Sequence, residues 1–185
     1  MHAALCDYIA DIVQNSVEAD AGKVTVELET GGKDIKVTIS DNGRGMSRGT
    51  LAAARDPFYT EPGKHRARKV GLGLPFLQEA ADQTGGEMKV DSEPGKGTRV
   101  YFSFPAGNWD TPPMGDIPST IVGLMCFNGK SDIVLHRIHA GNSYTVSKSE
   151  LVEALGELES AGSVEMARKF IMSQEEGLEN GPDGE

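Results

Sequence analysis

Residues 41–46 combine an acid with two glycines that are one residue apart, in the order Asp-Asn-Gly-Arg-Gly-Met. A carboxylate such as that of Asp41 can accept a hydrogen bond from an exocyclic amine. Gly43 and Gly45 allow a positive φ, or let the backbone approach a ligand that a Cβ would block. Taken alone, the stretch fits a ligand-binding loop and a plain strand-to-loop turn equally well.

Two polar residues near the N-terminus could serve the same chemistry. Asp11 and Asn15 lie within a segment whose apolar side chains recur every three or four residues, which predicts an amphipathic helix. Residues four apart share a helix face. The amide oxygen of Asn15 is a hard ligand that suits Mg²⁺, and the Asp11 carboxylate could orient or deprotonate a nucleophile. A merely polar helix edge is the alternative.

A basic run over residues 64–69 precedes a Gly-Leu-Gly-Leu sequence at 71–74. Basic runs in general are mostly solvated loops. Here the glycines would permit close approach of a ligand. A helix that begins near Leu74 would also direct the positive end of its dipole toward an anion. Together these residues could meet an anion.

Four motifs resemble the GHKL superfamily, which includes DNA gyrase, the large heat-shock chaperone ATPases, sensor histidine kinases and MutL-type mismatch repair proteins. The motifs are residues 11–21, 41–46, 70–77 and 93–98, in that order. The resemblance covers residues 3–105 and implies the Bergerat ATP-binding fold. Residues 85–98 are most similar to the catalytic ATP-binding domain of sensor histidine kinases, whereas the first helix is more similar to MutL.

The resemblance implies ATP and Mg²⁺ as ligands. It implies that Asn15 holds the metal ion, that Asp41 accepts a hydrogen bond from the adenine amino group, and that Thr98 lies near the base. Asp11 is the candidate catalytic residue; gyrase and MutL carry a water-activating glutamate there, and aspartate is one methylene shorter, so hydrolysis should be slow. The other implied nucleotide-binding residues are Gly43, Gly45 and Met46 around the base and Lys64, Arg66, Gly71, Leu72, Gly73 and Leu74 in a lid.

Hydrophobic patterns predict the elements that position these residues. Alternation with period two predicts strands at residues 23–29, 35–40, 87–92 and 98–104. A second amphipathic helix should begin near Leu74 and end at Gly85. With the resemblance, these elements indicate a two-layer α/β sandwich, in which a mixed β-sheet carries helices on one face.

The C-terminal third resembles no family that we recognise. We expect an ATP-binding domain over residues 1–107, a linker over 108–118, an accessory extension over 119–174 and a disordered tail over 175–185. In the extension, we expect an apolar strand at 120–127, a turn at 128–129 and further strands at 133–138 and 143–146. A capping box at 147–150 should open a helix that breaks at 161–162, and a last helix should follow over 164–173. The extension would thus be a hairpin and two helices that could extend the sheet.

Composition narrows the function classes. The net charge is −10, of which residues 108–185 contribute −8, and this argues against nonspecific nucleic-acid binding. No apolar run approaches the ~18 residues that span a bilayer, and no signal peptide is visible. Cys6 and Cys126 have no metal-binding spacing. We therefore expect a cytoplasmic protein with reduced thiols.

These observations favour a Mg-ATP-binding protein that transfers the γ-phosphate to a separate protein, as a histidine or serine kinase. The helical hairpin that carries the phosphorylated histidine of sensor kinases is missing from the sequence, so the acceptor is expected in trans. The alternative is an ATP-switched protein-binding module, or a slow ATPase without phosphotransfer. The sequence leaves open whether the chain forms a homodimer.

Overall fold

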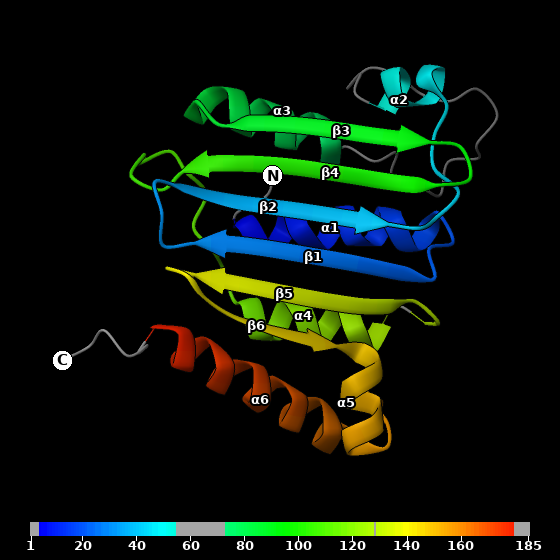
Figure 1. Cartoon of the computed structure of the whole chain (residues 1–185), viewed down its shortest axis with the longest axis vertical. Coiled ribbons are helices and arrows are strands. Elements are labelled where there is room, and N and C mark those ends of the chain that lie inside the picture. The colour runs from blue at the N-terminus through cyan, green and yellow to red at the C-terminus, as the bar shows by residue number, and fades with distance from the viewer. Residues whose placement is uncertain (1–3, 55–72, 128, 180–185) are drawn as a thin grey trace.

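The computed structural model describes residues 4–54, 73–127 and 129–179. Within these ranges six strands form one sheet, which faces the viewer in Figure 1. Neighbouring strands are antiparallel, except that β1 and β5 are parallel. The mixed sheet is therefore confirmed. In spatial order, its strands are β3 (Glu87–Glu93), β4 (Gly97–Pro105), β2 (Asp34–Asp41), β1 (Lys23–Thr30), β5 (Asp132–His139) and β6 (Asn142–Ser147).

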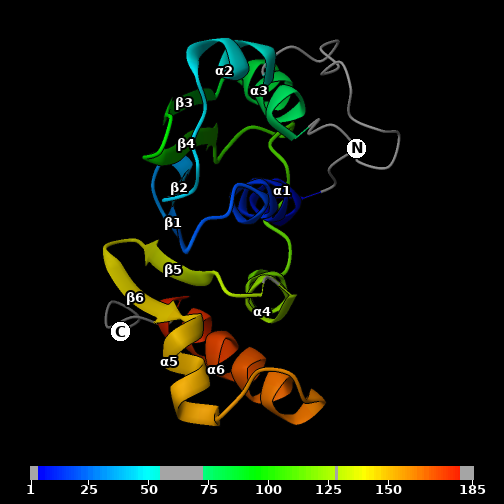
Figure 2. The same cartoon turned by 90° about the vertical axis from the view of Figure 1, so that its right-hand side faces the viewer.

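Helices cover one face of this sheet, as predicted. Figure 2 shows α1, α3 and α4 side by side on that face, with α1 in the middle. None of the helices in the described part of the chain has the length and apolarity needed to cross a lipid bilayer. The helices are α1 (Leu5–Glu18), α2 (Arg48–Ala54), α3 (Gly73–Thr84), α4 (Ile117–Phe127), α5 (Lys148–Leu155) and α6 (Ala161–Glu179).

Alternate side chains of the strands form the core beneath α1. On the helical face the central strands bury apolar residues, which gain stability by leaving water. The buried strand residues are Val24, Val26, Leu28, Val37, Ile39, Val100, Phe102, Phe104, Ile133 and Leu135. Helix α1 packs on them with Leu5, Ile9, Ile12 and Val13, all at most 3% exposed. The predicted apolar stripe of the first helix is therefore the side that anchors it to the sheet.

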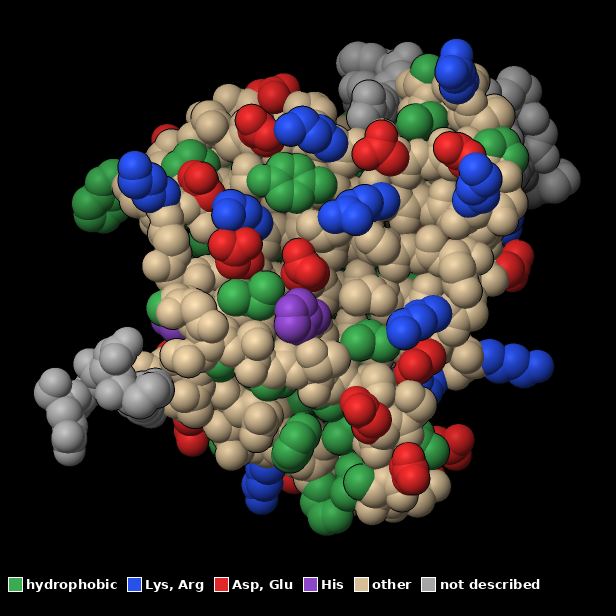
Figure 3. All heavy atoms as spheres, in the orientation of Figure 1, with side chains coloured by type: hydrophobic (Ala, Val, Ile, Leu, Met, Phe, Trp, Pro, Cys, Tyr) green, Lys and Arg blue, Asp and Glu red, His purple; other side chains and the backbone are tan. Residues whose placement is uncertain are grey.

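The opposite face of the sheet is open to solvent. Figure 3 shows acidic and basic side chains interspersed over it. Lys36 pairs with Glu29 across two strands at 3.0 Å. The Lys89 Nζ lies 5.7 Å from the centre of the Tyr101 ring. Exposed pairs of this kind contribute little to stability, so the sheet is held mainly by its helical face.

The prediction of a strand over residues 120–127 is wrong, because residues 117–127 form α4. A short apolar run fits a strand and a buried helix equally well, and α4 is buried from two sides by α1 and α6. Its start carried a signal that we missed. The Asp116 carboxylate accepts hydrogen bonds from the Ser119 backbone N–H at 2.9 Å and from Ser119 Oγ at 2.6 Å, and Pro118 is tolerated in the first turn.

The strand pairing of the extension also differs from the prediction. Strand β5 pairs with β1 and β6 rather than with residues 120–127. The hairpin turn is at Ala140 and Gly141, whose φ values of 47° and 90° suit a two-residue turn. The prediction that the extension could lengthen the sheet is confirmed.

The end of the chain is more helical than predicted. The capping box is confirmed, since Ser147 Oγ accepts from the Glu150 backbone N–H and Glu150 accepts from the Ser147 backbone N–H. The break is at Gly156, which has a φ of 82°, whereas residues 161–162 begin α6. Helix α6 continues to Glu179, so the disorder predicted for residues 175–179 is wrong. Residues 180–185 lie outside the described ranges.

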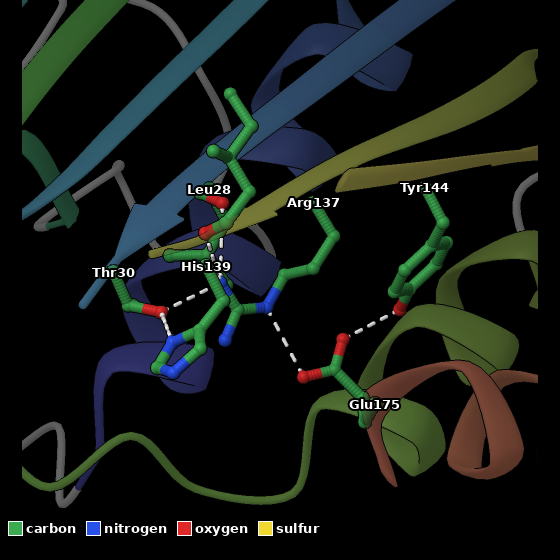
Figure 4. Close-up of polar contacts among 7 residues, drawn as sticks. Leu28, Thr30, Arg137, His139, Tyr144 and Glu175 are labelled. Atoms are coloured by element: carbon green, nitrogen blue, oxygen red, sulfur yellow. Dashed lines mark hydrogen bonds and ion pairs between the residues drawn. The ribbon is translucent and has the colours of Figure 1, made fainter. Parts of the chain in front are cut away.

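A buried charge cluster fastens α6 to the sheet (Figure 4). Arg137 Nε donates to Glu175 Oε2 at 3.1 Å, and these side chains are 7% and 15% exposed. Tyr144 donates to Glu175 Oε1 at 2.6 Å. Arg137 Nη1 also donates to Thr30 Oγ1 at 2.8 Å. Burial, followed by the bond to Glu175, raises the pKa of the Tyr144 hydroxyl far above its usual 10, so tyrosine remains a donor.

The turn before α6 should make the protein sensitive to acid. Glu157 accepts hydrogen bonds from Ser160 Oγ at 2.7 Å, from the Glu159 backbone N–H and from the Ser160 backbone N–H at 2.9 Å. These bonds, chiefly the one from Ser160 Oγ, lower the Glu157 pKa from its usual 4.5 to about 2. A depressed folded-state pKa gives stability that is present above pH 4.5 and is lost as the pH falls toward 2.

We therefore expect Glu157→Gln to lower stability at neutral pH and to flatten the loss of stability between pH 4.5 and 2. The measurement is the urea midpoint of unfolding at a series of pH values. Glu153→Gln, an exposed residue of α5, serves as the control and should follow the wild-type pH profile. Parallel profiles for wild type and Glu157→Gln would contradict the role of this turn.

Candidate functional site

Asp41, at the end of β2, is held by donors from three parts of the chain. Its Oδ1 accepts from the Gly43 backbone N–H at 2.9 Å and from the Thr98 backbone N–H at 3.1 Å. Its Oδ2 accepts from Ser16 Oγ at 2.7 Å. The structure thus brings together two residues that the sequence placed 57 positions apart, Asp41 and Thr98. It adds Ser16, which sequence reasoning missed.

The glycines of this loop allow close packing on the chain's own backbone. A Cβ on Gly43 would lie 2.7 Å from the Ala19 carbonyl oxygen, and the next residue, Arg44, donates its N–H to that oxygen at 2.8 Å. A Cβ on Gly45, whose φ is 62°, would lie 1.9 Å from the Glu93 carbonyl oxygen. The two glycines therefore shape the loop between α1 and the β3–β4 turn. Contact of Gly43 and Gly45 with a base stays a prediction.

Ser92 ties Met46 to Thr98. The Met46 backbone N–H donates to Ser92 Oγ at 2.8 Å, and Ser92 Oγ lies 2.9 Å from Thr98 Oγ1. Ser92 also donates to the Gly97 carbonyl oxygen at 3.1 Å. Sequence reasoning missed Ser92, because only the pairing of β3 with β4 places it opposite Thr98.

Helix α1 presents Asp11 and Asn15 on its exposed side, as the spacing predicted. Asp11 lies against the first turn of α3: a Cβ built on Gly73 would lie 3.3 Å from the Asp11 Cβ and 3.4 Å from Asp11 Oδ2. Leu74 is 8% exposed and packs into the core. The acid is therefore close to the positive end of the α3 dipole, where a negative charge is stabilised.

Helix α1 links the two halves of the site. Ser16 contacts Asp41 near the end of the helix, whereas Asp11 contacts α3 five residues earlier, a distance of about 7.5 Å along the axis. The structure thus places the Asp41 carboxylate and the N-terminus of α3 along one helix. The predicted lid residues Lys64, Arg66, Gly71 and Leu72 lie outside the described ranges.

The residues present suit a Mg²⁺ ion that arrives with phosphates. Asn15 offers one exposed amide oxygen. Within the described ranges no three His, Cys, Asp or Glu side chains cluster as ligands for a metal ion. Mg²⁺ keeps several waters and takes one or two protein oxygens plus substrate phosphates. Asn15 could thus supply one protein oxygen to such an ion, and Mg²⁺ at Asn15 stays a prediction.

The two cysteines are free thiols on α1 and α4. Cys6 is buried near the start of α1, and Cys126 is partly buried in α4. Burial is the main cause that raises the pKa of both thiols above their usual 9.0. Because the thiolate is the reactive form, burial should make both thiols less reactive.

Comparison with known proteins identifies a family. The family described as "Histidine kinase-, DNA gyrase B-, and HSP90-like ATPase" matches residues 2–108. The sensor histidine kinase ZraS of Escherichia coli O157:H7 is 27% identical over 113 residues, which are 60% of this chain and 24% of that kinase. Sporulation kinase E of Bacillus subtilis is 32% identical over 98 residues, which are 51% of this chain and 13% of that kinase. The chain thus spans a quarter or less of the length of these two relatives.

One solved structure shares the fold with a TM-score above 0.5. The N-terminal domain of a DNA repair protein superposes with a TM-score of 0.56 and 15% identity, covering 88% of this chain and 58% of that domain. The catalytic domain of the histidine kinase ThkA gives a TM-score of 0.42 with 22% identity, over 54% of this chain and 64% of that domain. The first of these covers more than the family match does, so the fold likeness extends into the C-terminal third.

Proposed function

Because this chain belongs to the family of histidine kinase-, DNA gyrase B- and HSP90-like ATPases, we propose that it binds Mg-ATP and transfers the γ-phosphate to a separate protein. The observation that carries the proposal is the Asp41 carboxylate, which three donors fix in place at the end of β2. A carboxylate held in this way presents an ordered acceptor for the amino group of adenine.

If the base binds at Asp41, the positions of the other proposed nucleotide-binding residues follow. Thr98 donates to Asp41, and Ser92 links Thr98 to Met46. Thr98 and Met46 would border the base, together with Gly43 and Gly45. The triphosphate would extend along α1 toward the first turn of α3, where Gly73 and Leu74 begin the helix, with Gly71, Leu72, Lys64 and Arg66 from the lid. A helix N-terminus suits phosphate oxygens.

Asn15 would hold the Mg²⁺, which neutralises charge on the phosphates when it is bound. Phosphoryl transfer depends on positioning and electrostatics more than on covalent chemistry by the protein. Asp11 would orient the incoming acceptor group. The acceptor is proposed to be a histidine imidazole or a serine hydroxyl of a protein partner.

The aspartate at position 11 also favours a second function. A water-activating glutamate would reach one methylene further, and Asp11 packs against α3 instead. An ATP-switched protein-binding module, or a slow ATPase without transfer, would need no stronger base. Phosphate transfer to a partner separates the two functions.

We expect the purified chain to hydrolyse ATP slowly and to label a protein partner with the γ-phosphate. Asn15→Ala should abolish the label, because it removes the proposed Mg²⁺ ligand. The measurement is transfer from γ-labelled ATP to proteins that co-purify with the chain. Gln14→Ala is the matched control, since Gln14 is the adjacent exposed residue of α1 and bonds only to Glu18 among the described residues; it should retain transfer.

Three results would revise the proposal. Partner binding that depends on ATP but gives no label rejects the kinase and leaves the switch. Label that persists in Asn15→Ala rejects the metal role of Asn15. Fast hydrolysis by the isolated chain rejects both functions and makes Asp11 a base.

A further inference from the structure

Ser16 is a buried polar residue on the otherwise apolar side of α1. It is 4% exposed, and its position continues the buried stripe of Ile12 and Val13. Two acceptors lie within reach of its hydroxyl: the Ile12 carbonyl oxygen at 3.2 Å and Asp41 Oδ2 at 2.7 Å. A hydroxyl has one proton to donate. The shorter bond to the carboxylate is the stronger, because its acceptor is charged.

The hydrogen bonds of Asp41 leave little room for a further donor. A carboxylate has about four acceptor positions. Among the residues that the structure describes, Gly43 and Thr98 take two positions on Oδ1, and Ser16 takes one on Oδ2. One position then remains, on Oδ2, and the Ser16 bond fixes its direction.

We propose that Ser16 is a positioning residue that aims Asp41 Oδ2 at the amino group of the base and so sets the preference for an aminopurine over a purine without the amine. This inference rests on the proposed nucleotide binding. Without the Ser16 hydroxyl, both acceptor positions of Asp41 Oδ2 are open, and no donor fixes the orientation of that oxygen. The base must then order the carboxylate itself, which lowers affinity.

The test is a thermodynamic cycle that removes one protein group, the Ser16 hydroxyl, and one ligand group, the 6-amino group of the base, singly and together. Equilibrium affinities are measured for ATP and for purine riboside triphosphate, which lacks the 6-amino group, with wild type and Ser16→Ala. Alanine favours the helix, so the variant should fold, and circular dichroism checks this. Ser163→Ala is the matched control: Ser163 is a buried serine of α6, 6% exposed, that donates to the carbonyl oxygen of Ser160, the residue before the helix.

We expect Ser16→Ala to weaken ATP binding about tenfold, the effect of one charge-assisted hydrogen bond. Binding of the amine-free analogue should change by less than about twofold, so the preference for ATP should fall by about fivefold or more. Ser163→Ala should change neither affinity.

Equal weakening of both nucleotides would overturn the inference, because a packing role does not depend on the amine. Unchanged affinity for both nucleotides would overturn it as well. The proposed nucleotide binding fails separately, if wild type binds neither nucleotide, and that result is visible before any variant is compared.

Discussion

Asp41→Asn should weaken ATP binding by about ten- to a hundredfold, because it removes a hydrogen bond to a charged acceptor worth ~1.5–3 kcal/mol. The structure indicates how the amide would sit. Two backbone N–H groups point at Oδ1, so the amide oxygen keeps that position. The amide nitrogen takes the Oδ2 position, where Ser16 can turn its proton to the Ile12 carbonyl oxygen and accept.

In that arrangement the amide directs an N–H at the base. Adenine also offers an N–H there, so two donors meet, whereas the 6-keto oxygen of inosine would find a donor. We therefore expect the ratio of ATP to inosine triphosphate affinity to fall further than the ATP affinity alone. Titration calorimetry with both nucleotides measures the two values.

Asp34→Asn is the matched control for this experiment. Asp34 is an exposed aspartate at the opposite end of the same strand, so it carries the same change of charge away from the site. It should leave both affinities unchanged. Equal ATP affinities for wild type and Asp41→Asn would refute the placement of the base at Asp41.

Glu175→Ala should lower the free energy of unfolding by about 3–5 kcal/mol, the cost of leaving a buried charge without its partner. Arg137 is 6% exposed, and Glu175 provides both the acceptor for its Nε and the acceptor for the Tyr144 hydroxyl. Without the Glu175 carboxylate, the Arg137 guanidinium and the Tyr144 hydroxyl both lose an acceptor between α6 and the sheet. Urea unfolding followed by circular dichroism measures the change.

Two further variants identify the cause. Glu165→Ala, on the same helix, removes the partner of Arg168 in an exposed pair and should cost much less. The double variant Arg137→Met with Glu175→Leu should recover much of the stability lost in Glu175→Ala, because apolar replacement removes the uncompensated charge. Similar losses in Glu175→Ala and Glu165→Ala would show that the cluster does not fasten α6.

The local chemistry of the sequence determined the first half of the fold. Alternation predicted β1, β2, β3 and β4, and an apolar stripe predicted α1, because each pattern reports a face that must leave water. Helix α2 was not predicted, because it is short and none of its residues is fully buried; Leu51 and Ala54 are only partly buried against the core. The capping box at Ser147 was readable because its partners are three residues apart.

Tertiary structure decided the elements and pairings that depend on contacts between segments far apart in the sequence. Residues 117–127 became α4 because α1 and α6 bury both of its sides, which no local pattern distinguishes from a strand. Strand β5 joined β1 in parallel, a pairing between segments more than a hundred residues apart. The composition predicted that Glu175 lies in an acidic, disordered tail. In the structure, its ion pair with Arg137, 38 residues earlier, joins it to the folded protein.

The candidate site shows the same division. Its motifs identified Asp11, Asn15 and Asp41, because the resemblance to a family lies in residue types and spacing. The partners of Asp41 were not readable, since Ser16 is 25 residues away and looks like one more position of an apolar helix stripe. Sequence alone determined which groups are proposed to carry the chemistry. Only the packing of α1 on the sheet decided which hydroxyl aims the carboxylate, because a hydrogen bond depends on where two elements meet.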